Sequence, residues 1–358
     1  MAYRVNITPV LSRITRCEAN PLVTPADVKP SRDDFEVLCA FNAGVARFGD
    51  ETLMLVRTAE RPIQEEGWVS VPALDVETGE IQAHRIAKDD PDADFADPRV
   101  VYHKHGFYLS SISHIRIARS TDGLHFSVDD EPAISPQTCY ETFGIEDPRV
   151  THIDGKYYID YASVSEHGVS TSLAVTEDFV SFERMGVMFC PSNRDVVIFP
   201  EKINGRYAAY HRPAPLDIGT LNMWLAWSPD LIHWGGHENV IGPRPGSWDS
   251  HRVGAGAPPL KTERGWLSIY HGATPDDWYH LGALLADPDE PGKIIARSEE
   301  ALLSPEAEYE LHGFYGHVVF TCGTTLDGDR LRIYYGAADT VMAAAEVSLS
   351  ELLDDLAG

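Results

Sequence analysis

The stretch "PRVTHIDGKYYIDYAS" (residues 148–163) consists of two β-rich runs on either side of Asp154 and Gly155. Val, Ile, Tyr and Thr favour extended strands, and Asp-Gly is a residue pair that tight hairpin turns prefer. Shortly afterwards, "LAVTEDFVSFER" (residues 173–184) adds a third run, an acidic turn and a fourth run with an aromatic residue. This part of the chain therefore predicts four consecutive antiparallel strands.

Both phrases recur along the chain. Hairpins are expected around Gly49, Gly106, Gly155, Gly205, Gly265 and Gly328, with spacings of 57, 49, 50, 60 and 63 residues. The second phrase recurs as "IARSTDGLHFS" (117–127) and "LAWSPDLIHWGG" (225–236). Four strands repeated at such a spacing are typical of β-propeller blades. We predict an all-β protein with a single domain, residues 1–358, folded as a five-bladed β-propeller whose N- and C-terminal segments share a blade and close the ring.

A pair of β-sandwiches is the alternative fold, because sandwiches also contain many short strands. Sandwiches do not repeat a four-strand phrase, so the propeller is favoured. Helix is expected only in "SLSELLDDLAG" (348–358), where Ser348 and Glu351 form the pattern of a capping box.

Composition limits the partners of this protein. Its 358 residues carry a formal net charge of −26, which disfavours binding to nucleic acid or to an anionic membrane. Five scattered cysteines without a CxxC spacing indicate reduced thiols, and the chain has neither a secretory leader pattern nor a membrane-spanning apolar stretch, so a cytoplasmic protein is expected. His103, His105 and His114 lack a matching carboxylate, so we predict no metal site and no cofactor. The sequence leaves the oligomeric state open, and a homo-oligomer is compatible with it.

Polar residues at the ends of the inner strands of a propeller converge on one central channel. Asp97, Glu146, Asp147 and Asp339 are its expected carboxylates, and Arg194, Arg212, Lys261, His211 and His271 are its expected cations and donors. A carboxylic acid beside aromatic residues suits the cleavage of a glycosidic bond. Basic side chains gathered in an acidic protein suit a small dianion such as inorganic phosphate.

The tetrapeptide Asp-Pro-Arg-Val occurs twice, at residues 97–100 and 147–150. Aspartate before proline is commonly a turn residue, so the duplication by itself indicates architecture: both copies are expected to open the inner hairpin of consecutive blades.

Six longer phrases identify a family. "GIEDPRV" (144–150), "NRDVVIFPEKINGRY" (193–207), "YHRP" (210–213), "WDSHRVGAGAPPLKTERGWLSIYHGA" (248–273), "YHLGALLADPDEPGKIIAR" (279–297) and "IYYGAADTVMAAA" (333–345) resemble the successive signatures of glycoside hydrolase family 130. That family comprises β-mannoside phosphorylases and related β-mannosidases. The resemblance, which runs from about residue 19 to the end, implies a five-bladed propeller. It also implies an inverting reaction in which phosphate attacks a β-mannoside and releases α-mannose 1-phosphate.

The resemblance also assigns residues. It implies Asp147 as the catalytic acid, which acts through a sugar hydroxyl. It implies a phosphate site made of Arg194, Arg212, Lys261, His211, His271 and Tyr335, and sugar contacts from Asn42, Arg57, Asp97, Glu146, Tyr270 and Asp339. Two residues depart from the family pattern: Ala43 stands where a proline is expected, and His317 stands where an asparagine is expected.

Three questions of function stay open at this point. The basic residues favour phosphorolysis by inorganic phosphate over hydrolysis by a β-mannosidase. The phrases "WDSHRVGAGAPPLKTE" and "YHLGALLAD" favour β-1,2-mannobiose and β-1,2-oligomannosides, with β-1,4-mannosyl substrates as the alternative. A non-catalytic propeller that binds a glycan is the alternative from another class of protein.

Overall fold

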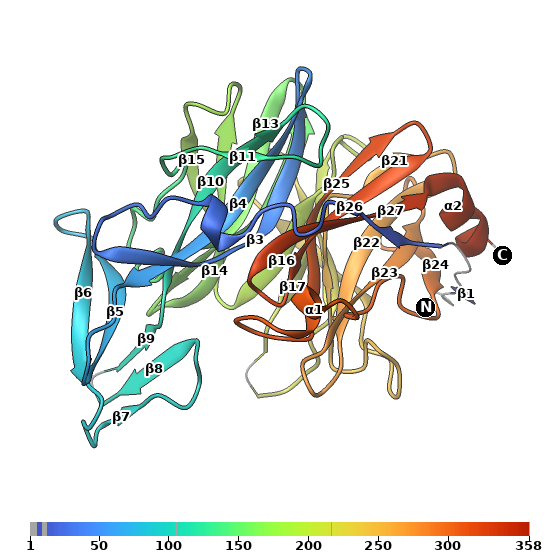
Figure 1. The fold of residues 1–358 in the computed structure, drawn as a ribbon. Helices are drawn as coiled ribbons and strands as arrows, with labels where there is room; N and C mark the ends of the chain where they lie inside the picture. The colour runs from blue at the N-terminus through green and yellow to red at the C-terminus, as the bar shows by residue number, and fades with distance from the viewer. Residues whose placement is uncertain (1–5, 9–12, 105, 216, 358) are drawn as a thin grey trace.

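The computed structural model describes residues 6–8, 13–104, 106–215 and 217–357. Most of these residues lie in strands, turns and loops, which confirms the predicted all-β class (Figure 1). The helical elements are η1 (Pro25–Asp27), α1 (Glu308–Leu311) and α2 (Leu349–Ala357). Helix α2 lies where a helix was predicted, and the Ser348 Oγ accepts a hydrogen bond from the Glu351 amide at 3.2 Å. Within the described residues, no helix is both long enough and apolar enough to span a membrane.

The hairpin turns follow from the residues at their tips. Asp154 and Gly155 have φ of 51° and 81°, and Asn204 and Gly205 have φ of 51° and 79°. Two consecutive residues with positive φ form the turn that matches the twist of antiparallel strands, and Asp, Asn and Gly tolerate this conformation best. In the first hairpin, Ile153 pairs with Lys156 directly beside the turn.

Outside a projecting arm, the described strands can be divided into five mainly antiparallel groups, numbered here along the chain. Groups 1, 2 and 5 belong to one twelve-stranded sheet, in which single parallel residue pairs join group 1 to group 2 and to group 5. Group 1 contains β3 (Phe35–Phe48), β4 (Glu51–Pro62), β10 (Ile112–Ser120) and β11 (Ser127–Val128). Group 2 contains β12 (Gly144–Ile153), β13 (Lys156–Ser165), β14 (Gly168–Thr176) and β15 (Glu183–Phe189). Group 3 contains β16 (Asn193–Ile198), β17 (Tyr207–Pro213), β18 (Met223–Ser228) and β19 (Gly235–Ile241).

The remaining two groups include strands from the N-terminal part of the chain. Group 4 contains β20 (Arg252–Ala255), β21 (Leu260–Thr262), β22 (Gly265–Ala273), β23 (Tyr279–Ala286), β24 (Ile294–Ser298) and the parallel strand β1 (Asn6–Thr8). Group 5 contains β25 (Val319–Asp327), β26 (Arg330–Ala337), β27 (Val341–Ser348) and β2 (Thr15–Arg16). Because β2 pairs with β27, the two ends of the chain share group 5.

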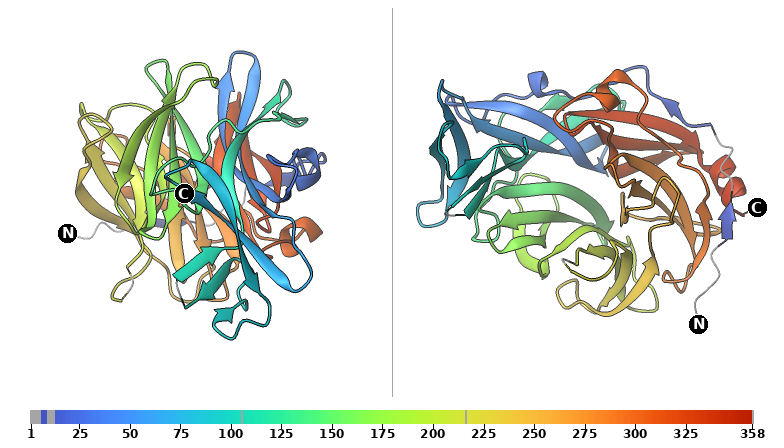
Figure 2. Two further views of the ribbon diagram at one scale, coloured as in Figure 1. Left: turned by 90° about the vertical axis from the view of Figure 1, so that its left-hand side faces the viewer. Right: turned by 90° about the horizontal axis from the view of Figure 1, so that it is seen from below.

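Each pair of neighbouring groups is held together by its own hydrophobic cluster. Such clusters lie between groups 1 and 2, 2 and 3, 3 and 4, 4 and 5, and 5 and 1. Seen from below in Figure 2, the groups are arranged around the middle of the molecule. The apolar faces of neighbouring groups therefore pack against one another. The first strand of each group lies toward the middle of the molecule.

A projecting arm interrupts group 1 between β4 and β10. It consists of β5 (Trp68–Asp75), β6 (Glu80–Ala87), β7 (Ala93–Asp94), β8 (Val100–His103) and β9 (Gly106–Leu109), which form a two-stranded and a three-stranded sheet (Figure 1). The hairpin at Gly106 was expected to open the inner hairpin of a blade, and this expectation is wrong. The first Asp-Pro-Arg-Val copy belongs to the arm, and only the second lies on an inner strand.

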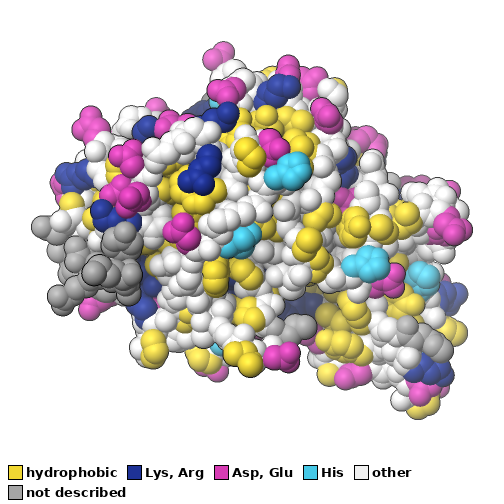
Figure 3. Space-filling model, turned by 180° about the vertical axis from the view of Figure 1, so that it is seen from behind, with side chains coloured by type: hydrophobic (Ala, Val, Ile, Leu, Met, Phe, Trp, Pro, Cys, Tyr) yellow, Lys and Arg dark blue, Asp and Glu magenta, His cyan; other side chains and the backbone are white. Residues whose placement is uncertain are grey.

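The surface seen from behind the molecule has a mixed character (Figure 3). Acidic and basic side chains are scattered over this face, with no single basic patch in view. The exposed large apolar side chains of the described residues include Tyr102 and Phe107 of the arm.

Candidate active site

A cavity of about 460 Å³ lies where the inner strands meet. Polar side chains from groups 1, 2 and 3 make up much of its wall, and groups 4 and 5 and the arm complete it. The lining residues that bear charge or a side-chain amide are Asn42, Arg57, Arg99, Glu146, Asp147, Arg194, Asp195, Arg212, Arg252 and Asp339, and the aromatic residues are Phe41, Tyr279, Phe314, Tyr315 and Phe320.

The same backbone irregularity occurs on three inner strands at this cavity. The register shifts in β3 between Phe41 and Gly44, in β12 between Glu146 and Arg149, and in β16 between Arg194 and Val197. At each shift a short polar residue has a left-handed backbone: φ is 47° at Asn42, 49° at Asp147 and 54° at Asp195. A bulge re-aims the side chain of a strand residue, and Asn and Asp adopt this conformation more readily than other residues with a Cβ. The three residues therefore occupy equivalent positions in groups 1, 2 and 3.

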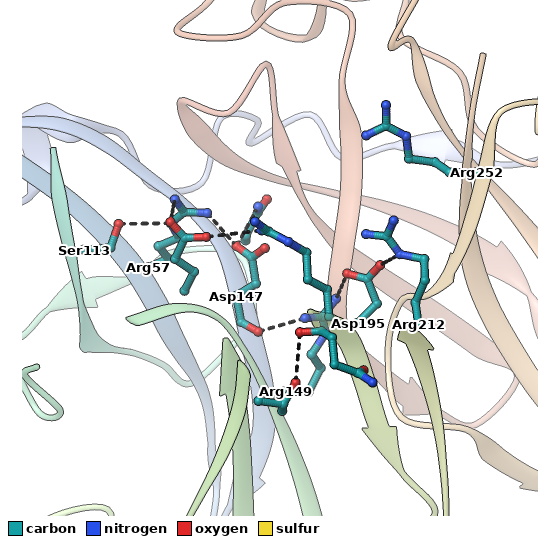
Figure 4. Close-up of polar contacts among 12 residues, drawn as sticks. Arg57, Ser113, Asp147, Arg149, Asp195, Arg212 and Arg252 are labelled. Atoms are coloured by element: carbon teal, nitrogen blue, oxygen red, sulfur yellow. Dashed lines mark hydrogen bonds and ion pairs between the residues drawn. The ribbon is translucent and has the colours of Figure 1, made fainter. Parts of the chain in front are cut away.

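The carboxylate of Asp147 is held by two side chains from group 1. Its Oδ1 accepts hydrogen bonds from the Asn42 Nδ2 at 3.0 Å and from the Arg57 Nη1 at 2.9 Å (Figure 4). Burial would raise the pKa of the Asp147 carboxyl, but the charges of Arg57 and Arg149 and the two hydrogen bonds outweigh it, so the pKa lies below its ordinary value.

Arg57 connects the carboxylates of the cavity. Its Nη2 donates to the Glu146 Oε1 at 2.7 Å, its Nε donates to the Ser113 Oγ at 3.1 Å, and its guanidinium lies over the Phe41 ring at 4.5 Å. A guanidinium with partners on three sides has a fixed orientation. Arg57 therefore fixes the position of the Asp147 carboxylate.

Asp339 follows β26 and also lines the cavity. Burial raises the pKa of its carboxyl to about 7, and the negative charges of Asp147 and Glu146 act in the same direction, against Arg57. Two carboxyls that influence each other in this way titrate as a pair. At pH 7 Asp339 therefore holds a proton in about half of the molecules, and below pH 7 in most of them, while Asp147 is ionised.

The basic wall of the cavity is formed by three arginines. Arg194 lies 3.7 Å from the Glu146 Oε2, and the Arg212 Nε donates to the Asp195 Oδ2 at 2.5 Å. Arg252 donates from its Nη1 to the Tyr279 hydroxyl at 2.7 Å and pairs with Asp277. Figure 4 shows the Arg252 guanidinium above that of Arg212. Each guanidinium can present two N–H donors side by side, which suits the binding of an oxyanion.

The structure brings seven of the predicted residues to this cavity: Asn42, Arg57, Glu146, Asp147, Arg194, Arg212 and Asp339. His271 lies directly behind the wall, fully buried, with its Nε2 3.2 Å from the Asp195 Oδ2. His211 lies further out, where its ring contacts the Asn193 side chain at 3.0 Å and His237 at 3.1 Å.

Four predicted residues lie away from the cavity lining. Lys261 is 54% exposed on β21 and pairs with Glu201. The Tyr335 hydroxyl donates to the buried Glu310 at 2.8 Å, and the Tyr270 hydroxyl donates to the buried Asp249 at 2.9 Å. Asp97 pairs with Arg99 at the surface of the arm, at 2.9 Å. These four side chains were expected to lie in the cavity with Asp147, but they do not line it. Lys261, Tyr335 and Tyr270 lie on strands whose alternation points them elsewhere, and Asp97 belongs to the arm.

Three charged lining residues are not among the predicted site residues: Arg99, Arg252 and Asp195. A signal for Asp195 was present, because Arg194-Asp195 at the start of β16 repeats the polar-Asp pattern of Glu146-Asp147 on β12. Arg252 lies at the start of β20, in the same family phrase as Lys261. The phrase by itself does not indicate which of the two cations faces the cavity. Within the described ranges, no cluster of His, Cys, Asp and Glu has the arrangement of a metal site, and His105 lies outside those ranges.

An all-β scaffold whose cavity joins buried carboxyls to a basic wall is suited to an enzyme that cleaves or forms glycosidic bonds. A family model described as beta-1,4-mannooligosaccharide phosphorylase matches residues 95–357. The chain belongs to glycoside hydrolase family 130, as its sequence phrases predicted.

Several named proteins are similar to this chain. A beta-1,2-mannobiose phosphorylase of Listeria innocua is 48% identical, and the match covers 96% of this chain and 98% of that protein. A 1,2-beta-oligomannan phosphorylase of Thermoanaerobacter sp. is 40% identical over 69% of this chain and 83% of that protein. The solved structure of the Listeria innocua beta-1,2-mannobiose phosphorylase in complex with beta-1,2-mannobiose superimposes with a TM-score of 0.92 and covers 96% of this chain and 99% of that chain.

Proposed function

We propose that this enzyme catalyses the reversible, inverting phosphorolysis of β-1,2-mannobiose, which yields α-mannose 1-phosphate and mannose. The observation that carries the proposal is the composition of one cavity: the Asp147 carboxyl is on its wall together with Arg194, Arg212 and Arg252. A carboxyl alone would suit hydrolysis equally well. Three arginines in a protein of net charge −26 favour a dianionic co-substrate.

In this proposal Asp147 is the general acid. Phosphate attacks the anomeric carbon, the bond from that carbon to the glycosidic oxygen breaks, and the leaving oxygen takes a proton that Asp147 relays through a sugar hydroxyl. Asp147 is ionised in the free enzyme, so the proton must come to it on substrate binding. The proton held on Asp339, or one carried by the phosphate, would supply it.

The substrate class rests on the relatives. The Listeria innocua relative, which matches over nearly the whole chain, is named for β-1,2-mannobiose, whereas a Ruminococcus albus relative at 35% identity is named for β-1,4-mannooligosaccharides. The higher identity and the fuller coverage favour the β-1,2 linkage for this chain. Inorganic phosphate is a co-substrate in this proposal.

The arrangement of strands fits a five-bladed β-propeller formed by one domain. Five groups of four to six strands, joined by five hydrophobic clusters in cyclic order among the described residues, support that architecture. Each group would be one blade, the arm would be an insertion in the first, and β2 would complete the last. An experimental structure would test this architecture through the closure between groups 1 and 5.

The function is tested by incubating the enzyme with β-1,2-mannobiose in the presence and in the absence of phosphate. We expect mannose 1-phosphate to form only with phosphate, and its α-configuration is checked by NMR during the first turnovers. Equal release of mannose in both samples, without mannose 1-phosphate, would establish hydrolysis instead. Phosphorolysis of β-1,4-mannobiose at a higher rate than β-1,2-mannobiose would overturn the linkage.

A further inference from the structure

Asp195 is a buried carboxylate at the basic wall, and nothing in the proposed chemistry uses it. It occupies on β16 the position that Asp147 occupies on β12, with the same bulge and the same left-handed backbone. Its surroundings differ, because its partners are Arg149, Arg212 and His271. Asp195 of group 3 therefore has the same backbone position as Asp147 of group 2 but different side-chain partners.

The two oxygens of Asp195 are occupied by guanidiniums. Its Oδ2 accepts from the Arg212 Nε at 2.5 Å, and its Oδ1 accepts from the Arg149 Nη2 at 3.4 Å (Figure 4). Although burial would raise the pKa of the Asp195 carboxyl, Arg212, His271 and Arg149 hold that pKa well below its ordinary value. The cluster of one carboxylate and two guanidiniums is net positive. Burial lowers the pKa of the His271 ring, so the positive charge of the cluster comes from the two arginines.

The contact with the Nε decides what Arg212 presents to the cavity. Arg212 is almost fully buried, so its side chain has little freedom beyond this bond. When the Nε edge of a guanidinium is occupied, the Nη1 and Nη2 groups remain as a forked pair of donors for an oxyanion. In Figure 4 the contact with Asp195 ends on the Arg212 Nε, and no contact is drawn from either of the Nη groups.

The neighbouring strand leaves room for this arrangement only because residue 254 is glycine. A Cβ on Gly254 would lie 2.4 Å from the Asp195 Oδ2 and 2.6 Å from the His271 ring. Such distances are shorter than real contacts of a Cβ, so a side chain at residue 254 would displace the Asp195 carboxylate or the His271 ring.

We infer that Asp195 is a positioning residue for phosphate, which acts by holding the Arg212 guanidinium with its Nη edge toward the anion. The inference rests on the proposed function, because it concerns how the same cavity binds its anionic co-substrate. Asp195 is too fully paired to act as an acid or a base. The effect of its loss should therefore appear in phosphate binding rather than in the chemical step.

The test compares Asp195→Asn with wild-type enzyme. The amide preserves the shape of the side chain but loses its charge, and we expect the KM for phosphate to rise about tenfold or more, as for the loss of a charge-assisted hydrogen bond. The KM for β-1,2-mannobiose should change little. In an Arg212→Ala background, Asp195→Asn should add almost nothing to the KM for phosphate, because the residue through which it acts is gone.

Asp249→Asn is the matched control. Asp249 is a fully buried aspartate that binds two arginines, Arg244 and Arg297, but it does not line the cavity. Its substitution removes a similar buried charge and should leave the KM for phosphate unchanged. Gly254→Ala is the second variant in case Asp195→Asn does not fold. It keeps every charge and displaces the Asp195 carboxylate, so it should also raise the KM for phosphate.

The outcomes separate the two proposals. If wild-type enzyme shows no dependence on phosphate, the proposed function fails. If wild-type enzyme requires phosphate but Asp195→Asn and Gly254→Ala leave its KM unchanged, only the role of Asp195 fails. The same conclusion holds if both substrates lose affinity equally, or if the effects of Asp195→Asn and Arg212→Ala are additive.

Discussion

At the scale of single residues, the site depends on which polar side chains face the cavity. The carboxylate of Asp147 has its charge balanced by Arg57 and its geometry fixed by Asn42. Asn42 itself fits only because residue 336 is glycine, since a Cβ there would overlap the Asn42 Oδ1 at 2.0 Å. The position of the proposed acid is therefore determined by packing as well as by charge.

Substitution Asp147→Asn tests the proposed acid. The amide can still accept hydrogen bonds from Asn42 and Arg57, so the fold should be retained while the transferable proton is lost. We expect kcat for β-1,2-mannobiose phosphorolysis to fall by about 10²–10⁴-fold, the usual contribution of general acid catalysis. Initial rates measure this loss, and an unchanged thermal unfolding temperature excludes misfolding. Near-normal turnover would place the acid elsewhere.

Arg252 and Lys261 provide a direct comparison, because they lie in one sequence phrase and only Arg252 lines the cavity. Arg252→Ala should raise the KM for phosphate at least about tenfold, because a charged donor to the anion is removed. Lys261→Ala breaks a surface pair with Glu201 and a contact with the Trp266 ring, both away from the cavity lining, and should leave that KM unchanged. If Lys261→Ala raised the KM for phosphate and Arg252→Ala did not, Lys261 would belong to the phosphate site, as the sequence predicts.

Asp339 makes stability depend on pH. Its pKa is about 7 in the folded protein and near 3.8 without the fold, so the folded state binds the proton more tightly. The stabilisation from this group is fully present below about pH 4 and is lost as pH rises to about 7. Asp339→Asn removes this loss. The measured quantity is the unfolding temperature of Asp339→Asn minus that of wild type. This difference should increase from pH 4 to 7 and then level off, and a difference that does not change with pH would refute the raised pKa.

At the scale of elements, the sequence predicts individual hairpins, but it does not show how the hairpins assemble into the five groups. Asp-Gly and Asn-Gly turns are local signals, so the hairpins at Gly155 and Gly205 could be read from the sequence. The hairpin at Gly106 has the same local signal but belongs to the arm, and only long-range pairing of β4 with β10 reveals this. Similarly, Asn42, Asp147 and Arg194 could be placed at strand ends, whereas Lys261 and Tyr335 could not be excluded without knowing which face of each strand is buried.

Strand β2 contributes an ion pair that joins it to the C-terminal part of the chain. The Arg16 Nε and Nη2 donate to the two carboxylate oxygens of Glu310, both at 2.8 Å, and Glu310 is fully buried. Arg16→Ala leaves a buried carboxylate without its charge partner, so we expect a loss of about 3 kcal/mol of stability. The exposed pair of Arg330 and Asp327 is the control, and Arg330→Ala should cost less than about 1 kcal/mol. Urea denaturation midpoints measure both, and equal shifts would contradict the expectation.

At the scale of the whole molecule, charge is divided between the surface and the centre. The net charge of −26 repels anions at long range, but this repulsion is screened beyond about 8 Å at physiological ionic strength. In the proposed function, the three arginines at the cavity wall, Arg194, Arg212 and Arg252, therefore decide anion binding locally. The net charge of the sequence disfavours nucleic acid as a partner, but it does not show where the few basic residues gather.

The pairing of β2 with β27 also sets the order in which the molecule can be completed during synthesis. Thr15 pairs with Glu346, so a strand made at the beginning must wait for one of the last strands to be made. Contacts between residues so distant in sequence form slowly, and a nascent chain meanwhile exposes apolar side chains such as Met54 and Val56, which later pack against β26 and β27. Ribosome-bound chains arrested before β27 should thus be cleaved readily by proteases within group 1, and those released at full length should become resistant.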